Sequence, residues 1–304
     1  MFTARNKGRL AIGAVVVGAA LALAGCSSSD PLGTGSSSSA PTDTITIGSQ
    51  AYYSNEIIAE IYAQALEHGG FTVKRDFNIG QRDRYLPSLE SGEVDLFPEY
   101  TGNLLQFYKP DTTATTADDV FAALKKVLPA SVTVLEKSSA TDQDSYNVTA
   151  DFAKANNIKS LSDLAKVTTP LTVGGPPELE ERPYGPKGLL SKYATTVAFS
   201  ATGDTTVDDL LAGTINIANV YSADPRIQTD KLVTLEDPKG LFLASNVVPL
   251  VNAKLADQLA PIINAVSAAL TPEGLVALNV QSTVDQKSPQ DIAKKWLTDN
   301  GLLK

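Results

Sequence analysis

The chain has 304 residues, with 25 lysines and arginines against 34 aspartates and glutamates, which gives a formal net charge of −9. An acidic chain of this kind, with no basic cluster, is a poor candidate for binding nucleic acid. One cysteine and one histidine offer little for disulfides, metal sites or nucleophilic catalysis, so we expect no cofactor and no metal.

The N-terminus has the pattern of an export signal. Arg5, Lys7 and Arg9 precede an uncharged apolar run, residues 10–24, which is too short for a comfortable transmembrane helix. The run ends in LAGC, which resembles the lipobox of bacterial lipoproteins, where the cysteine becomes the lipidated first residue. We therefore interpret residues 1–25 as a lipoprotein signal peptide.

Residues 26–43 are rich in Ser, Gly, Pro and Thr and have too little apolar surface to fold. They predict a flexible tether that follows a lipidated Cys26. The protein is then expected at the extracytoplasmic face of the cell membrane, held there by lipid. The alternative is a chance cysteine after an ordinary signal peptide.

From residue 44 onward, segments that alternate like strands take turns with segments of helical period. The predicted strands cover residues 44–48, 71–77, 94–97, 131–135, 146–149, 171–174, 197–199, 215–220 and 246–251. The predicted helices cover residues 55–67, 85–91, 116–128, 151–156, 161–166, 187–193, 206–212, 254–270, 272–280 and 289–300. This alternation predicts an α/β fold with largely parallel sheets and helices on both faces. We expect two lobes, residues 44–140 with 246–304 and residues 141–245.

The stretch DLFPEYTGN, Asp95 to Asn103, is the least regular part of this pattern. Pro98 and Gly102 disfavour both helix and strand, so we interpret the stretch as a strand end that runs into a turn. Ligands of open α/β sheets bind outside the carboxyl ends of strands, where such polar turns meet.

Five predicted strand ends carry polar turns, and four of them carry a tyrosine while the fifth is followed by an arginine. They are GSQAYY, PEYTGN, TDQDSY, NVYS and GGPPE, at residues 48–53, 98–103, 141–146, 219–222 and 174–178. A single tyrosine most often packs with its hydroxyl in water. Four at corresponding strand ends favour a shared aromatic pocket.

Tyrosine faces attract a cation by about 0.5 to 2 kcal/mol per ring when water is excluded. A quaternary ammonium suits such a pocket because it has no hydrogen bonds to lose. Asp144 would add the opposite charge, and Arg182 would hold a carboxylate by two parallel hydrogen bonds. These groups together favour a betaine-like solute.

From about residue 45 to the C-terminus the chain resembles the solute-binding lipoproteins of osmoprotectant ABC importers, which take up glycine betaine, carnitine or choline. The resemblance lies in IGSQAYYSNEIIAEIYAQALE, EVDLFPEYTGN, GGPPELEERPYGPKGL and GTINIANVYSADPRI, in this order. It implies a two-lobed clamshell of the type II periplasmic-binding-protein class, with an aromatic cage between the lobes. It also implies a permease partner with a separate ATPase, no enzymatic activity, and a monomer.

The resemblance implies roles for individual residues. Tyr100, Tyr146 and Tyr221 would be cage walls, Asp144 would line the pocket, and Arg182 would meet the carboxylate. Gln50 falls at the position of a lysine in relatives, and Asn103 at that of a pocket threonine. The ligand-binding residues expected in this way are Gln50, Tyr53, Tyr100, Asn103, Asp144, Tyr146, Arg182, Tyr221 and Asn246. Tyr146→Ala and Tyr221→Ala are each expected to weaken binding with little loss of melting temperature.

The chain departs from the family where an aromatic pair usually precedes the returning strand. Ser245 and Asn246 replace those rings, and either Tyr52 or Tyr53 is expected to close the gap. A ligand larger or more hydroxylated than glycine betaine would fit such a site. A polyol, aromatic or amino-acid-derivative binder of the same fold is therefore an alternative.

A secreted hydrolase is the more distant alternative. The only histidine, His68, is explained by its position at a helix end, and no G-x-S-x-G motif is present. The chain is expected to cross between the lobes near residues 138–142 and 244–247, where closure on a ligand would place the hinge.

Overall fold

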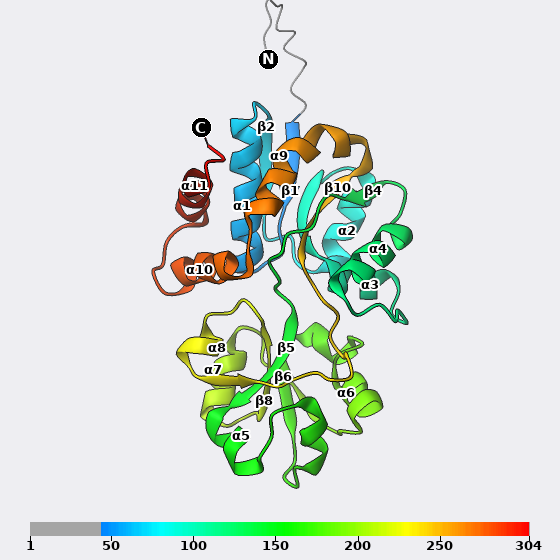
Figure 1. Cartoon of the computed structure of the whole chain (residues 1–304), viewed down its shortest axis with the longest axis vertical. Coiled ribbons are helices and arrows are strands. Elements are labelled where there is room, and N and C mark those ends of the chain that lie inside the picture. Colours follow the sequence, from blue (N-terminus) through cyan, green and yellow to red (C-terminus); the bar gives the residue numbers. More distant parts are fainter. Residues whose placement is uncertain (1–43, 304) are drawn as a thin grey trace, which may run out of the picture. The chain divides into compact units, whose positions relative to one another are not determined.

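The computed structural model describes residues 44–303, so the predicted signal peptide, the tether and Cys26 lie outside the described residues. Residues 44–303 contain two mixed β-sheets of five strands each (Figure 1). The first lobe is the part of the chain built on the sheet that contains residues 44–48. The second lobe is the part built on the sheet that contains residues 144–149.

The first sheet has the strand order β2-β1-β3-β10-β4. Its strands are Thr72–Asp76, Thr44–Gly48, Leu96–Tyr100, Val247–Asn252 and Val132–Val134, in that order. Strand β1 is parallel to β2 and β3, whereas β10 is antiparallel to β3 and β4. The helices of this lobe are α1 (Tyr53–His68), α2 (Arg82–Ser91), α3 (Thr101–Tyr108), α4 (Ala117–Val127), α9 (Ala256–Ala269), α10 (Pro272–Thr283) and α11 (Pro289–Asp299).

The alternation of side chains along the strands gives this sheet two apolar faces. Leu96 and Val247 pack in the core that contains α1, while their neighbours Phe97 and Val248 pack in the core of α2, α3 and α4. Both faces are therefore covered by helices, as an α/β sheet requires.

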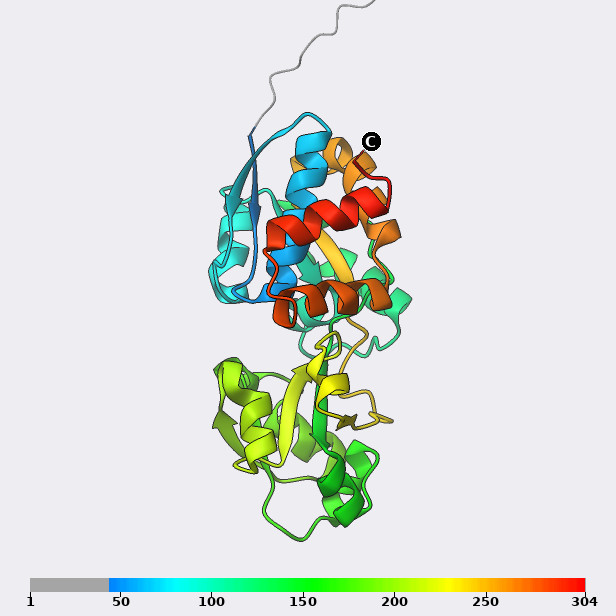
Figure 2. The ribbon, with the colours of Figure 1, turned by 90° about the vertical axis from the view of Figure 1, so that its left-hand side faces the viewer.

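The C-terminal helices pack on the core that contains α1. Ile292 and Trp296 of α11 lie in the same core as α1, and Figure 2 shows α11 lying across α1. Both of these helices begin with a proline and have a side-chain cap: Thr271 accepts a hydrogen bond from the backbone N–H of Gly274, and Ser288 accepts one from that of Asp291.

The second sheet has the strand order β7-β6-β8-β5-β9. Its strands are Ala198–Ala201, Thr172–Gly175, Ile217–Tyr221, Asp144–Thr149 and Leu232–Thr234, in that order. The helices of this lobe are α5 (Ala150–Asn156), α6 (Pro186–Tyr193), α7 (Thr206–Ala212) and α8 (Arg226–Thr229), with short 3₁₀ turns η1 (Leu161–Lys166), η2 (Pro177–Glu181) and η3 (Gly203–Thr205). Strand β5 is antiparallel to both neighbours, as β10 is in the first sheet.

The prediction of largely parallel sheets therefore holds for only half of the pairings. The strands that break it, β5 and β10, are those that the chain enters directly from the other lobe. Such a strand needs no helical crossover within its own sheet, so it is free to run antiparallel.

The two segments that connect the lobes run side by side. Ser138 donates its backbone N–H to Val247, and Val247 donates to Ala140, while Thr141 and Asn246 form an antiparallel bridge. This short ladder couples the two crossings (Figure 1).

The DLFPEYTGN stretch differs from the predicted turn. Pro98 lies inside β3 opposite Pro249 of β10, an arrangement possible because paired residues in a non-hydrogen-bonded position need no N–H. Helix α3 begins directly afterwards at Thr101. A Cβ on Gly102 would meet the backbone oxygen of Ala244 at 2.8 Å, so glycine here lets the second crossing pass close to α3.

Among residues 44–303, no single helix is long and apolar enough to cross a membrane. Helices α9 and α10 reach that length and composition only as a pair, across a bend of 87°.

Candidate functional site

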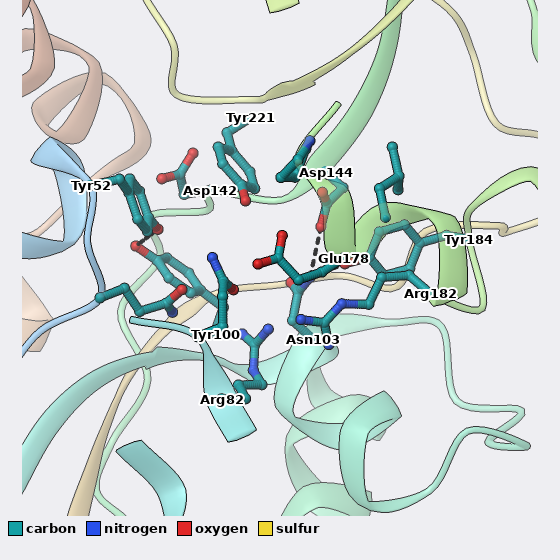
Figure 3. Close-up of a pocket in the computed structure, with 14 residues that line it drawn as sticks. Tyr52, Arg82, Tyr100, Asn103, Asp142, Asp144, Glu178, Arg182, Tyr184 and Tyr221 are labelled. Atoms are coloured by element: carbon teal, nitrogen blue, oxygen red, sulfur yellow. Dashed lines mark hydrogen bonds between the residues drawn. The ribbon is translucent and has the colours of Figure 1, made fainter. Parts of the chain in front are cut away.

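A cavity that is partly open to solvent lies between residues of both lobes (Figure 3). Its lining residues are Gln50, Tyr52, Gln81, Arg82, Tyr100, Asn103, Asp142, Asp144, Pro176, Glu178, Leu179, Arg182, Tyr184 and Tyr221. The lining is unusual in combining four tyrosines with three carboxylates and two guanidinium groups.

Three of the tyrosine rings form one wall. The ring of Tyr52 stacks on that of Tyr221, with 5.5 Å between centroids and 20° between planes, and lies 6.5 Å from the ring of Tyr100. The Tyr52 hydroxyl donates to the Tyr100 hydroxyl. Burial raises the pKa of both phenols above the ordinary value, so the rings stay neutral.

The position of the first helix decides which of the two adjacent tyrosines reaches this wall. Tyr52 has an extended backbone and precedes α1, whereas Tyr53 is the first helical residue. Their rings are therefore nearly perpendicular, at 83°. Tyr52 lines the cavity, and Tyr53 points into a neighbouring one.

Asp142 places a buried carboxyl beside the tyrosine wall (Figure 3). Its oxygens accept hydrogen bonds from the Ser54 hydroxyl at 3.1 Å and from the backbone N–H of Ala223 at 3.2 Å. Burial raises the pKa of Asp142 to about 7, and these two hydrogen bonds oppose that rise. A cation in the cavity would stabilise the ionised form.

Glu99 holds Arg82 at the floor of the cavity. The Arg82 guanidinium donates two hydrogen bonds to the Glu99 carboxylate, at 2.9 and 2.8 Å. Glu99 also accepts from the Tyr85 hydroxyl and from the backbone N–H of Tyr100. All of these groups are buried, so the glutamate of DLFPEYTGN serves to fix a buried arginine and the strand end that carries Tyr100.

A polar network closes the opposite side. The Asn103 amide nitrogen donates to Asp144 at 2.7 Å and to the Tyr184 hydroxyl at 3.1 Å, while its oxygen accepts from Ser245 at 2.6 Å. The ring of Tyr184 is supported by Phe242, with 5.6 Å between centroids. Because Asn103 belongs to α3 and Asp144 to β5, the network joins the two lobes.

Six of the predicted ligand-binding residues line the cavity: Gln50, Tyr100, Asn103, Asp144, Arg182 and Tyr221. Three do not. Tyr53 lines the neighbouring cavity, Asn246 is buried at the crossing with its amide on Ser138, and Tyr146 is fully buried in the second-lobe core.

The location of Tyr146 corrects the expectation for its alanine variant. Its hydroxyl donates to the backbone oxygen of Tyr184 at 2.7 Å, and its ring packs on Phe242. Removing a fully buried ring costs core packing, so Tyr146→Ala is expected to lower stability rather than spare it.

Sequence reasoning missed Gln81, Arg82, Asp142, Glu178 and Tyr184 as lining residues. Asp142 and Glu178 belong to the predicted polar turns 141–146 and 174–178, and Tyr184 lies in GGPPELEERPYGPKGL, but none of the three was expected to bind ligand. Arg82 gave no signal, because a charged residue in a polar helix normally faces water. The histidine that the hydrolase alternative would need, His68, is exposed at the end of α1.

Residues 43–299 match OpuAC, the substrate binding domain of ABC-type glycine betaine transport systems. The chain is 26% identical over 282 residues to the glycine betaine-binding protein YehZ of Escherichia coli, covering 86% of this chain and 92% of that protein. It is 27% identical over 275 residues to the carnitine transport binding protein OpuCC of Listeria monocytogenes, covering 85% and 87%.

Solved structures show the same fold. A crystal structure of a glycine betaine/carnitine/choline ABC transporter matches with a TM-score of 0.71 at 20% identity, covering 86% of this chain and 100% of that chain. Lactococcal OpuAC in its closed-liganded conformation with glycine betaine matches with a TM-score of 0.60 at 17% identity, covering 86% and 99%. The chain thus has the two-lobed fold of type II periplasmic binding proteins, with its cleft between the lobes.

Proposed function

The chain belongs to the OpuAC family of substrate-binding domains of ABC-type glycine betaine transport systems. From this family membership we propose that it captures a quaternary-ammonium osmoprotectant outside the cell and delivers it to an ABC permease. Glycine betaine, choline and carnitine are the ligands that its relatives suggest. Proteins of this family are solute-binding components of importers, and we propose that this chain likewise catalyses no reaction.

The observation that carries this proposal is the tyrosine wall with a carboxylate beside it. Tyr52, Tyr100 and Tyr221 present three rings to one end of the cavity, next to Asp142 (Figure 3). A methylated ammonium loses little on leaving water, and each ring contributes about 0.5 to 2 kcal/mol once water is excluded. This end of the cavity is therefore suited to the ammonium.

The other end offers a place for a carboxylate. Arg182 lines it near Tyr184, and Arg82 lies on the floor between the two ends. Glu99 already engages two nitrogens of Arg82. Arg182 is thus the guanidinium better placed to form a bidentate pair with a ligand carboxylate.

Capture would proceed by closure of the lobes. The ligand contacts both lobes only in the closed form, so its binding energy favours closure. The Asn103–Asp144 hydrogen bond would add to that preference, and the paired crossings at residues 138–142 and 244–247 would form the hinge.

We further propose that the protein acts as a monomer tethered by lipid on Cys26, with a permease and a separate ATPase as partners. The LAGC sequence and the composition of residues 26–43 support this anchoring. Lipid on the outer face of the membrane would keep the captured solute within reach of the permease.

A thermal-shift screen of the purified protein tests the proposed function. The panel contains glycine betaine, proline betaine, carnitine, choline, ectoine, several polyols and several aromatic compounds. A ligand at a hundred times its dissociation constant stabilises the native state by about 2.7 kcal/mol. A shift with a methylated ammonium solute, recovered unchanged by NMR after incubation, supports the proposal. A shift with a polyol or aromatic compound alone would favour a different ligand class, and consumption of the solute would favour an enzyme.

A further inference from the structure

Three carboxylates line the ligand cavity, and they differ in how the protein satisfies them. Asp142 accepts two hydrogen bonds, and Asp144 accepts one from Asn103. Glu178 is half-buried, and within residues 44–303 its carboxylate has neither a hydrogen-bond donor nor an ion-pair partner. Its oxygens are therefore free to accept a hydrogen bond from a ligand.

Arg182, four residues later, is likewise uncommitted. In the described part of the chain its guanidinium forms no ion pair and no side-chain hydrogen bond, not even with Glu178. Figure 3 shows the Glu178 carboxylate pointing into the cavity between the tyrosine wall and the Arg182 guanidinium. The cavity thus offers, in this order, a wall for a quaternary ammonium, a hydrogen-bond acceptor and a cation.

The turn η2, which carries Glu178, is held in place by the second-lobe core. Leu179 of this turn is buried in that core. Its backbone N–H donates to Pro176 at 2.9 Å, and its carbonyl oxygen accepts from Arg182 at 3.1 Å. A Cβ on Gly185 would meet the same carbonyl oxygen at 2.0 Å, so the chain folds back tightly over the turn. A fixed backbone therefore presents Glu178 to the ligand, as a residue that determines specificity requires.

A carboxylate without a donor inside a ligand cavity favours a ligand that brings an O–H group. When the lobes close and exclude water, a ligand with no donor at this point leaves the Glu178 oxygens unsatisfied. A ligand hydroxyl replaces the lost water, and its hydrogen bond to a charged acceptor is of the stronger kind. Such a site rejects an analogue without the hydroxyl more strongly than an apolar pocket does.

We propose that Glu178 determines specificity by accepting a hydrogen bond from a hydroxyl group of the ligand, and so selects hydroxylated quaternary ammonium solutes. The inference rests on the proposed function, because it requires the ammonium against the tyrosine wall. Carnitine carries an ammonium, a hydroxyl and a carboxylate in the order in which the cavity offers the tyrosine wall, Glu178 and Arg182. Choline has the ammonium and the hydroxyl, whereas glycine betaine lacks the hydroxyl.

Isothermal titration calorimetry with two matched pairs of solutes tests the proposal. γ-Butyrobetaine is carnitine without its hydroxyl, and ethyltrimethylammonium is choline without its hydroxyl. The members of a pair share their charges and their carbon skeleton, so the ratio of their dissociation constants reports on the hydroxyl. In each pair we expect the hydroxylated solute to bind about tenfold more tightly or better.

Two variants connect the preference to Glu178. Glu178→Leu, which removes the acceptor, should reduce both ratios to within twofold. It should also weaken all four solutes, because the cavity loses a negative charge, but that common loss cancels in the ratios. Glu178→Gln keeps one side-chain oxygen and should retain a ratio of about threefold. Glu180→Leu, at an exposed glutamate of the same turn outside the cavity lining, is the matched control and should leave both ratios unchanged.

The outcomes separate this inference from the proposed function. Equal affinities within each pair that binds, or ratios that persist in Glu178→Leu, would overturn the role of Glu178 while the capture of a quaternary ammonium stands. If none of the four solutes binds and glycine betaine does not bind either, the proposed function fails, and the role of Glu178 fails with it.

Discussion

Asn103 of α3 and Asp144 of β5 form a hydrogen bond of 2.7 Å that joins the two lobes beside the ligand cavity. The same amide nitrogen donates to Tyr184, and Ser245 at the second crossing donates to the Asn103 oxygen. One side chain thus connects the first lobe, the second lobe and the hinge. This arrangement predicts that closure depends on Asn103.

Asn103→Leu should weaken ligand binding by about tenfold or more, because a hydrogen bond to a charged group contributes about 1.5 to 3 kcal/mol. The melting temperature without ligand should change little, since each lobe keeps its own core. Calorimetric titration and thermal unfolding measure the two effects. Asn156→Ala, at the surface of α5, is the control; an equal loss of affinity there, or unchanged affinity in Asn103→Leu, would contradict the assignment.

Asp142→Asn should change how stability depends on pH. The raised pKa of Asp142, about 7, means that the folded protein keeps this proton after the unfolded chain has lost it. The stabilisation by the protonated form is complete below about pH 4 and is lost as the pH rises through 7. The free energy of unfolding of the variant, relative to that of the natural protein, should therefore rise by about 2 to 3 kcal/mol as the pH goes from 5 to 8.

Ligand binding should respond to pH in the opposite sense. A quaternary ammonium favours ionised Asp142, so affinity in the natural protein should increase as the pH rises through 7. In Asp142→Asn the affinity should be lower and nearly independent of pH. Urea unfolding and calorimetric titration at pH 5, 6, 7 and 8 check both expectations, and an unchanged pH dependence in the variant would exclude Asp142 as the titrating group.

Tyr221→Leu should separate binding from stability. Loss of one ring from the tyrosine wall should weaken the binding of a quaternary-ammonium ligand by roughly two- to thirtyfold, from about 0.5 to 2 kcal/mol. Tyr221 is only half-buried, so the melting temperature should fall little. Tyr108→Leu, at a half-buried tyrosine outside the cavity, is the control.

Tyr146→Ala should behave differently and lose about 3 to 5 kcal/mol of stability, as large core truncations do.

Glu99→Gln should destabilise the fold by about 3 to 5 kcal/mol, because it leaves the buried Arg82 guanidinium without its countercharge. The double variant Arg82→Met with Glu99→Leu should recover much of this loss, since no buried charge remains. Chemical unfolding of the three proteins measures the difference. A Glu99→Gln protein as stable as the natural one would mean that Arg82 does not depend on Glu99.

The sequence predicted the parts of this structure that follow from local chemistry. Tyr100, Asn103 and Tyr221 stand at strand ends, and the rule that ligands bind there placed them in the cavity. The helices predicted to begin at residues 272 and 289 do begin at Pro272 and Pro289.

Features that depend on distant partners could not be predicted. Arg82 is buried only because Glu99, seventeen residues away, meets it, and neither residue alone indicates that pair. The choice between Tyr52 and Tyr53 depends on the first residue of α1, a boundary that pattern alone leaves uncertain by a residue or more. Tyr146 lies near a polar turn of the sequence, as Tyr100 does, yet the pleat of β5 directs its ring into the core.

The central claim is that the tyrosine wall and Asp142 recognise a positive charge. Calorimetric titration of glycine betaine against 3,3-dimethylbutanoate, which has carbon in place of the quaternary nitrogen, tests this claim most directly. The two molecules share their shape and their carboxylate and differ only in the cationic centre. We expect glycine betaine to bind and 3,3-dimethylbutanoate to bind at least a hundredfold more weakly or not at all. If carnitine is the ligand, the same difference is expected between carnitine and its carbon analogue. Equal affinity for both would show that the cavity selects shape rather than charge, and the proposed recognition of a quaternary ammonium would be wrong.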